Sequence, residues 1–331
     1  MEIQKMLIND LRLIWQKNQQ QTYQNLNVLL LQTYWQMGER IVQDEQNGQN
    51  RAKYDKKTLQ SISIELSEEF GKGFSVDNLE NMRRFYLIYS KSETVFRNSE
   101  GSFRLSWSHY LQLIKLNAEQ ERLYYEMEAL QNAWSVRELK RQIQSALYQR
   151  LVSQRNPQEV LALSTKGLEI QTAKDLVKDP YILEFLGLKN EQSFSENELE
   201  EAIIDKLEHF LLELGKGFTF VARQKRITIE NKHFFVDLVF YNRLLRCFVL
   251  IDLKIGELKH QDLGQIQMYV NFYDRFVKLE EENKTIGIVL CQSKNDTLVE
   301  ITLPENNDQI FASRYQTVLP SKEELQKLLN P

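Results

Sequence analysis

Cysteine and histidine are scarce in this chain, and their scarcity excludes several kinds of site. The sequence has two cysteines and four histidines among 331 residues. Cys247 and Cys291 both lie in apolar runs without C-x-x-C or Cys/His ligand spacing, and the histidines form no H-E-x-x-H pattern. We therefore expect buried, reduced thiols, and neither a zinc site nor structural disulfides.

Long hydrophobic runs and a strong net charge are also lacking. No uninterrupted apolar stretch approaches the roughly 18 to 20 residues of a membrane helix, and the first residues resemble an amphipathic helix rather than a signal peptide. The net charge of −4 is too small to support or exclude nucleic acid as a partner. We expect a soluble, cytoplasmic protein without a membrane partner.

Helical periodicity fills the first part of the chain, where glycine is rare. We expect an all-α domain over 1–155, with amphipathic helices over 4–18, 22–47, 55–70, 76–90, 105–115, 117–131 and 135–153. Residues 62–90 have the outline of a helix-turn-helix, with a Gly-x-Gly turn and Ser75 as an N-cap. An αα-hairpin with an apolar core explains the same pattern equally well. If the segment contacts DNA, the polar candidates are Lys72, Asn78, Asn81 and Arg84.

The pattern changes to mixed α/β after residue 195, and a connecting segment with short helices is expected over 156–194. The domain over 195–331 begins with a helix that Ser195 caps, and a C-terminal helix ends it. Between these we expect strands over 217–229, 233–242, 246–255, 284–291, 297–303 and 310–317, and a helix over 261–279. The overall fold class is therefore α+β, with a mixed central sheet in the second domain.

Two acids interrupt neighbouring apolar strands in this second domain. Asp237 lies in 233-HFFVDLVFYN-242, and Asp252 is followed two residues later by Lys254 in 247-CFVLIDLKIG-256. A charged side chain inside such a run is costly unless it is paired or bound to metal. Because strand side chains alternate with period two, Lys254 can face the same cleft as Asp252. This layout is typical of a metal-dependent phosphodiesterase site.

Flanking helices add polar candidates to this pair of strands. Gln265 and Tyr269 lie one turn apart on one face of the helix that follows the second acid. In the helix that begins at Ser195, steps of three, four, seven and eleven from Glu200 all reach apolar residues, whereas those from Glu201 reach a mixed set. Glu200 is therefore the better candidate for a further acid, and a boundary residue at a helix start is the alternative.

The order of elements and the D-x-K motif resemble the PD-(D/E)xK nuclease superfamily, and the Q-x-x-x-Y pair looks like the accessory motif of its exonuclease-type and recombination-type members. The whole chain resembles the YhcG-like family of bacterial PDDEXK nuclease-domain proteins. The segments that carry this resemblance are 74-FSVDNLENMRRFY-86, 105-LSWSHY-110, 134-WSVRELKRQI-143, 210-FLLELGKGFTFVARQ-224, 235-FVDLVFYNRLLRCFVLIDLKIGE-257 and 264-GQIQMYVNFYD-274. It implies a restriction-endonuclease-like fold for the second domain.

The resemblance also implies a site and a reaction. Asp237 and Asp252 would bind Mg²⁺ or Mn²⁺, with the Leu253 carbonyl and Glu200 as further ligands, and Lys254 would orient water or neutralise charge. Gln265 and Tyr269 would hold the scissile phosphate or the lysine, while Gln224 and Lys259 could contact nucleic acid. DNA is the expected substrate of an endonuclease or exonuclease, RNA is left open, and a homodimer is expected by analogy. The alternative is a non-catalytic nucleic-acid-binding or assembly protein that keeps the nuclease fold.

Overall fold

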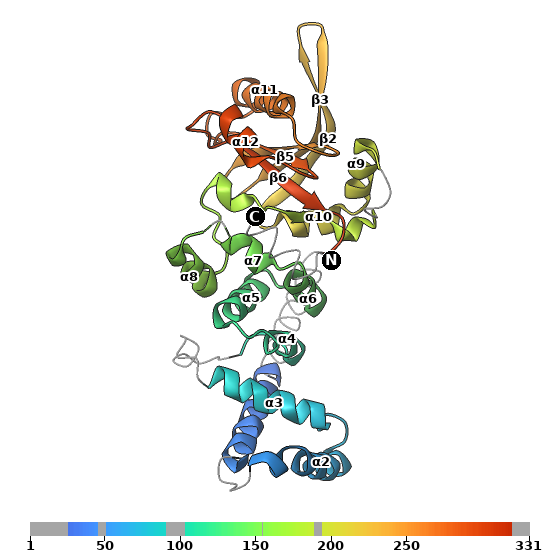
Figure 1. Ribbon diagram of the computed structural model, residues 1–331, viewed down its shortest axis with the longest axis vertical. Helices are drawn as coiled ribbons and strands as arrows, with labels where there is room; N and C mark the ends of the chain where they lie inside the picture. The colour runs from blue at the N-terminus through green and yellow to red at the C-terminus, as the bar shows by residue number, and fades with distance from the viewer. Residues whose placement is uncertain (1–25, 46–50, 91–102, 154, 189–193, 320–331) are drawn as a thin grey trace, which may run out of the picture. The chain divides into compact units, whose positions relative to one another are not determined.

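The computed structural model describes residues 26–45, 51–90, 103–153, 155–188 and 194–319. The chain forms two compact units, Met1–Arg141 and Gln142–Pro331 (Figure 1). The expected helix over 4–18 and the expected C-terminal helix lie outside the described residues. All four tryptophans of the sequence, at positions 15, 35, 107 and 134, belong to the first unit.

The first unit is helical, as its periodicity predicts. Residues 26–45 are helical, and they are followed by α2 (Arg51–Phe70), α3 (Val76–Tyr89), α4 (Trp107–Leu113), α5 (Glu119–Gln131) and α6 (Val136–Gln144), the last of which crosses the unit boundary. Aromatic rings hold these helices together: the ring centroid of Phe85 lies 5.4 Å from that of Trp107 and 5.1 Å from that of Tyr110. The segment 105–110 therefore serves core packing.

The structure corrects the helix expected over 135–153, because it consists of two helices, α6 and α7 (Leu147–Val152). Ala146 adopts a left-handed backbone conformation between them, with φ of 48°. Arg150 belongs to the second unit, and its side chain points into the interior of that unit rather than into water. Its guanidinium makes a 2.7 Å ion pair with Glu213, and both side chains are fully buried.

The second unit is built on a six-stranded sheet in the order β1-β6-β5-β4-β3-β2. Its strands are β1 (Tyr181–Ile182), β2 (Phe218–Ile229), β3 (Lys232–Asn242), β4 (Cys247–Leu253), β5 (Ile286–Cys291) and β6 (Ile310–Gln316). β2, β3 and β4 pair antiparallel, whereas β4, β5, β6 and β1 pair parallel. The predicted mixed sheet is therefore confirmed, with β1 as an additional edge strand.

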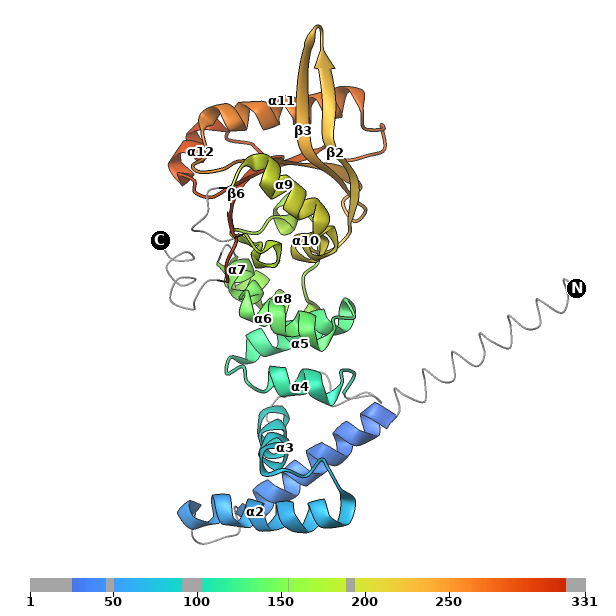
Figure 2. The same cartoon turned by 90° about the vertical axis from the view of Figure 1, so that its right-hand side faces the viewer.

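Helices cover both faces of this sheet (Figure 2). One apolar cluster joins the sheet to α9 (Glu196–Asp205) and α10 (Leu207–Leu214), through Leu199 and Phe210 among others. The other joins it to α11 (His260–Phe276), where Ile266 and Val270 pack directly on Gly287 of β5. Cys247 and Cys291 are free and buried, as expected.

One expected strand of this unit is wrong. Residues 297–303 fall mostly in the helix α12 (Asp296–Thr302), which the Asn295 side chain caps by accepting a hydrogen bond from the Leu298 amide. The run TLVEITL is rich in β-branched residues, which favour strands, but the cap and the short length allow one helical segment.

The segment 156–194 contributes to the sheet and to its core. It contains α8 (Pro157–Lys166), two 3₁₀ turns, η2 (Ala173–Leu176) and η3 (Glu184–Leu186), and the strand β1 between them. Tyr181 and Leu183 are completely buried in the cluster under α9 and α10. The division into a domain over 1–155, a connection over 156–194 and a domain over 195–331 stays a prediction.

Candidate active site

The two acids of the motif lie together where β3 and β4 stop pairing. Leu238 pairs with Ile251 in this antiparallel ladder, so Asp237 and Asp252 come one residue beyond that pair on each strand. Asp252 is 1% exposed, and Asp237 is half-buried. The Leu253 amide donates a 2.7 Å hydrogen bond to Asp237 Oδ2, which ties the first acid to the strand that carries the second.

The lysine of the motif contacts the second acid. Lys254 Nζ lies 2.9 Å from Asp252 Oδ2 and 3.8 Å from Glu196 Oε2 on α9. The backbone amide of Lys254 donates a hydrogen bond to the Leu290 carbonyl on β5, and this bond fixes the backbone position from which the lysine side chain extends. The structure therefore brings Asp237, Asp252 and Lys254 into one cluster at adjoining strand ends.

Burial sets the protonation of this cluster. It raises the pKa of Asp252 to about 7, against the opposing effect of Lys254, and the charge of Asp237 raises it further. Burial also raises the pKa of Asp237, although hydrogen bonds from the Leu253 amide and Gln224 oppose this. For Lys254, burial lowers the pKa, but the carboxylates of Asp252, Glu196 and Asp237 outweigh it and the pKa is raised. Two buried carboxylates that repel each other favour binding of a cation.

The predicted burial of Glu200 is confirmed. Glu200 is 3% exposed in α9, whereas Glu201 is exposed. Its Oε1 lies 3.0 Å from Arg223 Nε, and its Oε2 accepts a hydrogen bond from Gln224. The same Gln224 amide donates a 3.0 Å bond to Asp237 Oδ1, so Gln224 links the two acids.

The helix pair Gln265 and Tyr269 contacts the backbone of β3 through Tyr269, and its role in holding a phosphate or the lysine stays a prediction. Gln265 donates a 2.6 Å hydrogen bond to the Tyr269 hydroxyl, which itself donates 2.8 Å to the carbonyl oxygen of Phe235. Tyr269 is completely buried. Its pKa is raised by burial, against the Gln265 hydrogen bond and together with the charges of Asp252 and Asp237. The pair therefore fixes the strand that carries Asp237.

Two buried carboxylate oxygens in this region have ion pairs as their contacts. Asp252 Oδ2 lies beside Lys254, and Glu200 Oε1 lies beside Arg223. Among the described residues, no three Asp, Glu, His or Cys side chains lie close enough together to hold a metal ion. The acid pair is thus the centre of the site.

The sequence analysis did not identify Glu196 and Arg223, which form ion pairs with Lys254 and Glu200. Glu196 contacts Lys254, and its Oε1 accepts a 3.3 Å hydrogen bond from the Ile255 amide. It lies four residues before Glu200, on the same face of α9, and this spacing could have indicated it. Arg223 carried no such signal, because its contact depends on how β2 packs against α9.

The candidate nucleic-acid residues of the first unit occupy different environments. Lys72 and Arg84 are exposed and Asn81 is half-buried. Asn78 is held within the fold, since its amide donates to the Gly73 carbonyl at 2.5 Å and accepts from Trp107 Nε1 at 3.0 Å. Both polar ends of this amide are used within the fold, and its contact with DNA stays a prediction. Lys259, in the second unit, is exposed before α11.

Comparison with known proteins gives the family. The model of the YhcG PDDEXK nuclease domain matches residues 174–330, and that of the DUF1016 N-terminal domain matches residues 10–150. A relative from Escherichia coli (strain K12), described as "Putative nuclease YhcG", is 34% identical over 332 residues, covering 92% of this chain and 88% of that protein. The chain belongs to the YhcG family of PDDEXK nucleases. Its α+β fold with a restriction-endonuclease-like second unit agrees with this membership.

Solved structures add only a distant likeness. A repair endonuclease from Pyrococcus abyssi is 18% identical, with a TM-score of 0.26 over 38% of this chain and 50% of that one. An EndoMS–dsDNA complex gives 18% identity and a TM-score of 0.26 over 41% of this chain and 51% of that one. The chain spans about half the length of these proteins, and scores so low carry no argument about this family member.

Within the described ranges, no helix is long and apolar enough to cross a membrane.

Proposed function

We propose that this YhcG family member is a divalent-metal-dependent phosphodiesterase that hydrolyses DNA, with Asp237, Asp252 and Lys254 as its catalytic core. The observation that carries the proposal is the buried Asp252 beside the half-buried Asp237, with Lys254 Nζ 2.9 Å from Asp252 Oδ2. Two acids and one lysine at adjoining strand ends match the chemistry of phosphoryl transfer, which needs charge neutralisation and an oriented nucleophile.

The residues present fit a hard cation. Asp252 is 1% exposed, with Lys254 as the ion-pair partner of its Oδ2, and Asp237 faces it from the neighbouring strand. Carboxylate oxygens suit Mg²⁺ and Mn²⁺, and the Leu253 carbonyl is the further ligand that we propose. Glu200 would act through a bound water, because it does not form a three-acid cluster with the pair. When bound, such an ion polarises a phosphoryl oxygen and lowers the pKa of water.

The chain's own residues position and neutralise the reacting groups. Lys254 lies beside Asp252, where its ammonium orients a water molecule and offsets the negative charge that develops on the phosphate. Gln224 holds Asp237 and Glu200 in a fixed relation through its amide. Tyr269 and Gln265 hold β3 in place from α11. Carboxylates held in fixed positions would keep the metal ligands correctly placed relative to the phosphate.

The partners follow from the reaction class. DNA is the substrate that we propose, and RNA is tested in the same assay as the alternative. A homodimer would place two such sites on the two strands of a duplex. The helical unit is the proposed contact for DNA or a partner protein, with Lys72 and Arg84 as exposed cations among the side chains described in the α2–α3 segment. Asn81 is a half-buried neighbour of these on α3.

Cleavage of a labelled substrate panel tests the proposal. Full-length protein is incubated with Mg²⁺ or Mn²⁺ and with linear, circular, nicked, branched and single-stranded DNA, and with RNA. We expect cleavage that Asp252→Asn and Lys254→Ala each reduce by at least about a hundredfold. Asp308→Asn and Lys284→Ala are matched controls, because this ion pair of 3.3 Å has the same chemistry at a surface where the side chains are 65% and 64% exposed.

Persistent cleavage in both catalytic variants would overturn the assignment of these residues. The alternative, a nuclease fold kept as a scaffold, is favoured by the absence of a three-residue metal cluster among the described residues. Calorimetry with Mg²⁺ and Mn²⁺ separates the two. Binding heat that disappears in Asp237→Ala supports the enzyme, whereas no heat in either protein supports the scaffold.

A further inference from the structure

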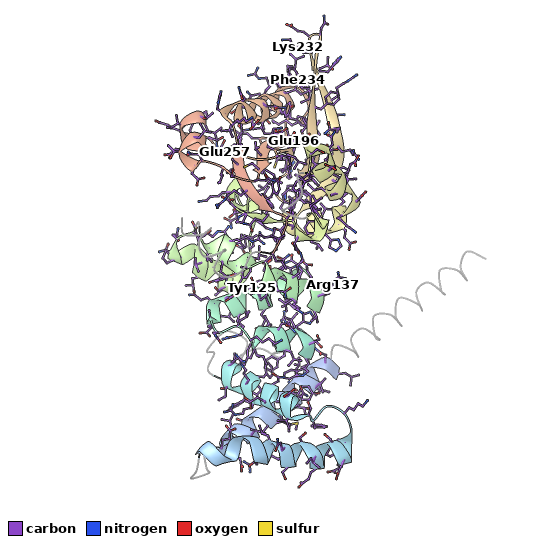
Figure 3. The ribbon with its side chains drawn as sticks, turned by 45° about the vertical axis from the view of Figure 1, so that its right-hand side comes forward. Tyr125, Arg137, Glu196, Lys232, Phe234 and Glu257 are labelled. Carbon is purple, nitrogen blue, oxygen red and sulfur yellow. The ribbon has the colours of Figure 1, made fainter. Side chains whose placement is uncertain are left out.

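The β2–β3 hairpin extends beyond the rest of its sheet in both views (Figures 1 and 2). Figure 3 labels Lys232 and Phe234 near its free end. Between residues 223 and 235 it has four Lys and Arg residues, and Glu230 is its one acid. A projecting ribbon with this excess of positive charge attracts polyanions, and it includes the strand that carries Asp237.

The register of the hairpin divides its side chains between two faces. Ile227 pairs with Phe234, and both belong to the apolar cluster under α11. Because side chains alternate along a strand, the adjacent pairs take the opposite face. A 3.0 Å hydrogen bond between Thr228 Oγ1 and His233 Nδ1 agrees with this. The outer hairpin face is defined here as the cross-strand pairs Arg226–Phe235 and Thr228–His233.

The outer hairpin face begins next to the proposed catalytic cluster. Gln224 and Asp237 follow these pairs along the two strands as an unpaired position of the ladder, and a 3.0 Å hydrogen bond joins their side chains. Phe235 is two residues from Asp237, which is about 7 Å along a strand. A chain bound on the outer hairpin face would therefore lead directly to the acids.

Phe235 is an aromatic ring held in an exposed position. Its side chain is 46% exposed and belongs to neither apolar cluster of the described second unit. Its backbone is fixed, because its carbonyl accepts the 2.8 Å hydrogen bond from the Tyr269 hydroxyl. Leaving a phenylalanine ring in water loses the free energy of its burial, and a base that stacks on the ring restores part of it.

Arg226 provides the positive charge beside this ring. It pairs with Phe235 across the ribbon and is exposed. Within the parts of the chain that the structure describes, no acidic side chain lies within ion-pair distance of it. An unpaired guanidinium next to an exposed aromatic ring is the combination that binds a phosphate and its base together.

We propose that the outer hairpin face binds single-stranded nucleic acid, with a base stacked on Phe235 and a phosphate on Arg226. In a duplex the flat faces of the bases are covered by their neighbours, so stacking on Phe235 requires an unpaired nucleotide. The inference rests on the proposed function, because it names the form of substrate that reaches Asp237 and Asp252. It predicts that the strand passes along β2–β3 into the cluster.

Binding of a labelled oligonucleotide to Phe235 variants tests the stacking. Fluorescence anisotropy is measured in EDTA, so that no cleavage occurs, with a single strand and with the blunt duplex of the same sequence. We expect Phe235→Leu to weaken single-strand binding roughly 5- to 150-fold and Phe235→Trp to preserve it. Phe276→Leu is the matched control, because Phe276 is 74% exposed at the end of α11, and it should change nothing.

The salt dependence of binding tests the phosphate contact. Arg226→Gln should reduce the slope of log K against log salt by about 0.7, the value for one phosphate contact on a single strand. Lys225→Gln is the control, because it removes the same charge from the adjacent position, which faces the other side of the ribbon. An equal change of slope in both variants would overturn a specific contact at Arg226.

Cleavage by the same proteins separates this inference from the proposed function. Wild-type cleavage in Mg²⁺ or Mn²⁺ together with unchanged single-strand binding by Phe235→Leu overturns the inference and leaves the nuclease assignment intact. Loss of binding in Phe235→Leu without any wild-type cleavage overturns the nuclease assignment alone. An equal loss for duplex and single strand also overturns the inference, since it would show that no unpaired base is needed.

Discussion

The Tyr269 hydroxyl on α11 donates a 2.8 Å hydrogen bond to the carbonyl oxygen of Phe235 on β3. Phe235 precedes Asp237 by two residues, so this bond fixes the strand immediately before the first acid of the cluster. Gln265 donates to the same hydroxyl at 2.6 Å and directs its proton toward β3. The side chains of the Q-x-x-x-Y pair therefore act on the backbone that carries the site.

Tyr269→Phe should impair catalysis while preserving most of the fold. It leaves the Phe235 carbonyl without its donor, at a cost of roughly 1–3 kcal/mol, and frees the strand that carries Asp237. We expect a lower kcat for cleavage with little change in oligonucleotide affinity. Tyr273→Phe is the matched control, because Tyr273 lies on the same helix with 2% of its surface exposed, and its hydroxyl hydrogen-bonds to no described residue. Equal kcat values for the two variants would contradict a positioning role.

Gly287→Ala should destabilise the second unit. A Cβ at this position would lie 2.6 Å from Ile266 Cγ1 and 2.8 Å from Val270 Cγ2, where α11 packs on β5. Overpacking of this kind costs roughly 1–3 kcal/mol. Gly264→Ala on α11 meets nothing within 4 Å and should stabilise the protein by roughly 0.5–1 kcal/mol. Urea unfolding followed by circular dichroism measures both, and a stabilising Gly287→Ala would contradict the packing.

Arg150→Met should be among the most destabilising single substitutions. Arg150 and Glu213 form a 2.7 Å ion pair in which both side chains are fully buried, and Arg150 also donates to the Pro180 carbonyl at 2.9 Å. Removing one partner leaves an unpaired buried charge, at a cost of about 3–5 kcal/mol. The double variant Arg150→Met, Glu213→Leu should recover much of the loss. Additive effects in this double-mutant cycle, measured by urea unfolding, would count against the pair.

Glu126 should make the stability of the first unit depend on pH. Its oxygens accept hydrogen bonds from Tyr110 at 2.8 Å and Tyr89 at 2.9 Å, and it is 6% exposed. Burial raises its pKa in the folded protein, against these bonds and Arg122. A raised pKa in the folded state means that folding favours the protonated form of Glu126. The contribution of Glu126 to the free energy of unfolding is therefore complete below the pKa of the unfolded state. It is lost as the pH rises through the pKa of the folded state.

The variant Glu126→Gln isolates this effect. All four tryptophans belong to the first unit, so tryptophan fluorescence follows its unfolding selectively. The difference in unfolding free energy between wild type and Glu126→Gln should change between the unfolded pKa of about 4.3 and the higher folded value, and then level off. A difference that is constant over that interval would contradict a raised pKa for Glu126.

Divalent metal should stabilise the wild-type protein through Asp252. A ligand that binds only the folded state stabilises by about 2.7 kcal/mol at a hundred times its Kd, so Mg²⁺ or Mn²⁺ should raise the Tm. Asp252→Asn removes a buried carboxylate of the proposed site and should abolish that rise, whereas Asp308→Asn should retain it. Equal Tm shifts in all three proteins, measured by calorimetry, would place the metal elsewhere.

The parts of the fold with strong local patterns were predictable from the sequence. The strands that carry Asp237 and Asp252 are apolar runs with clear ends, and the observed β3 and β4 begin and end within two residues of the expected bounds. Ser195 caps its helix as expected, in a capping box with Glu198, and the burial of Glu200 follows from the periodicity of that helix. These features depend on neighbours in sequence, which the pattern itself records.

Features set by distant contacts could not be predicted in this way. Ala146 interrupts a helix without a glycine or proline to signal it, because the buried Arg150–Glu213 pair positions the next helix. The helix α12 replaces an expected strand, since Asn295 caps a run whose composition favours strands. Tyr269 carried the right spacing, but its target, the Phe235 carbonyl, depends on how α11 packs against β3.

The pairing of β1 with β6 sets a condition on how the second unit is completed during synthesis. Tyr181 pairs with Tyr315, and Ile182 pairs with Gln316. The edge strand β1 is synthesised first, and it cannot pair until β6, the last strand to be synthesised, has left the ribosome. The intervening strands and α11 can assemble earlier, but the buried residues of β1 stay exposed until then. Nascent chains that end before residue 310 should therefore already contain the Asp252–Lys254 ion pair, but in a sheet that lacks β6 and has not yet paired with β1.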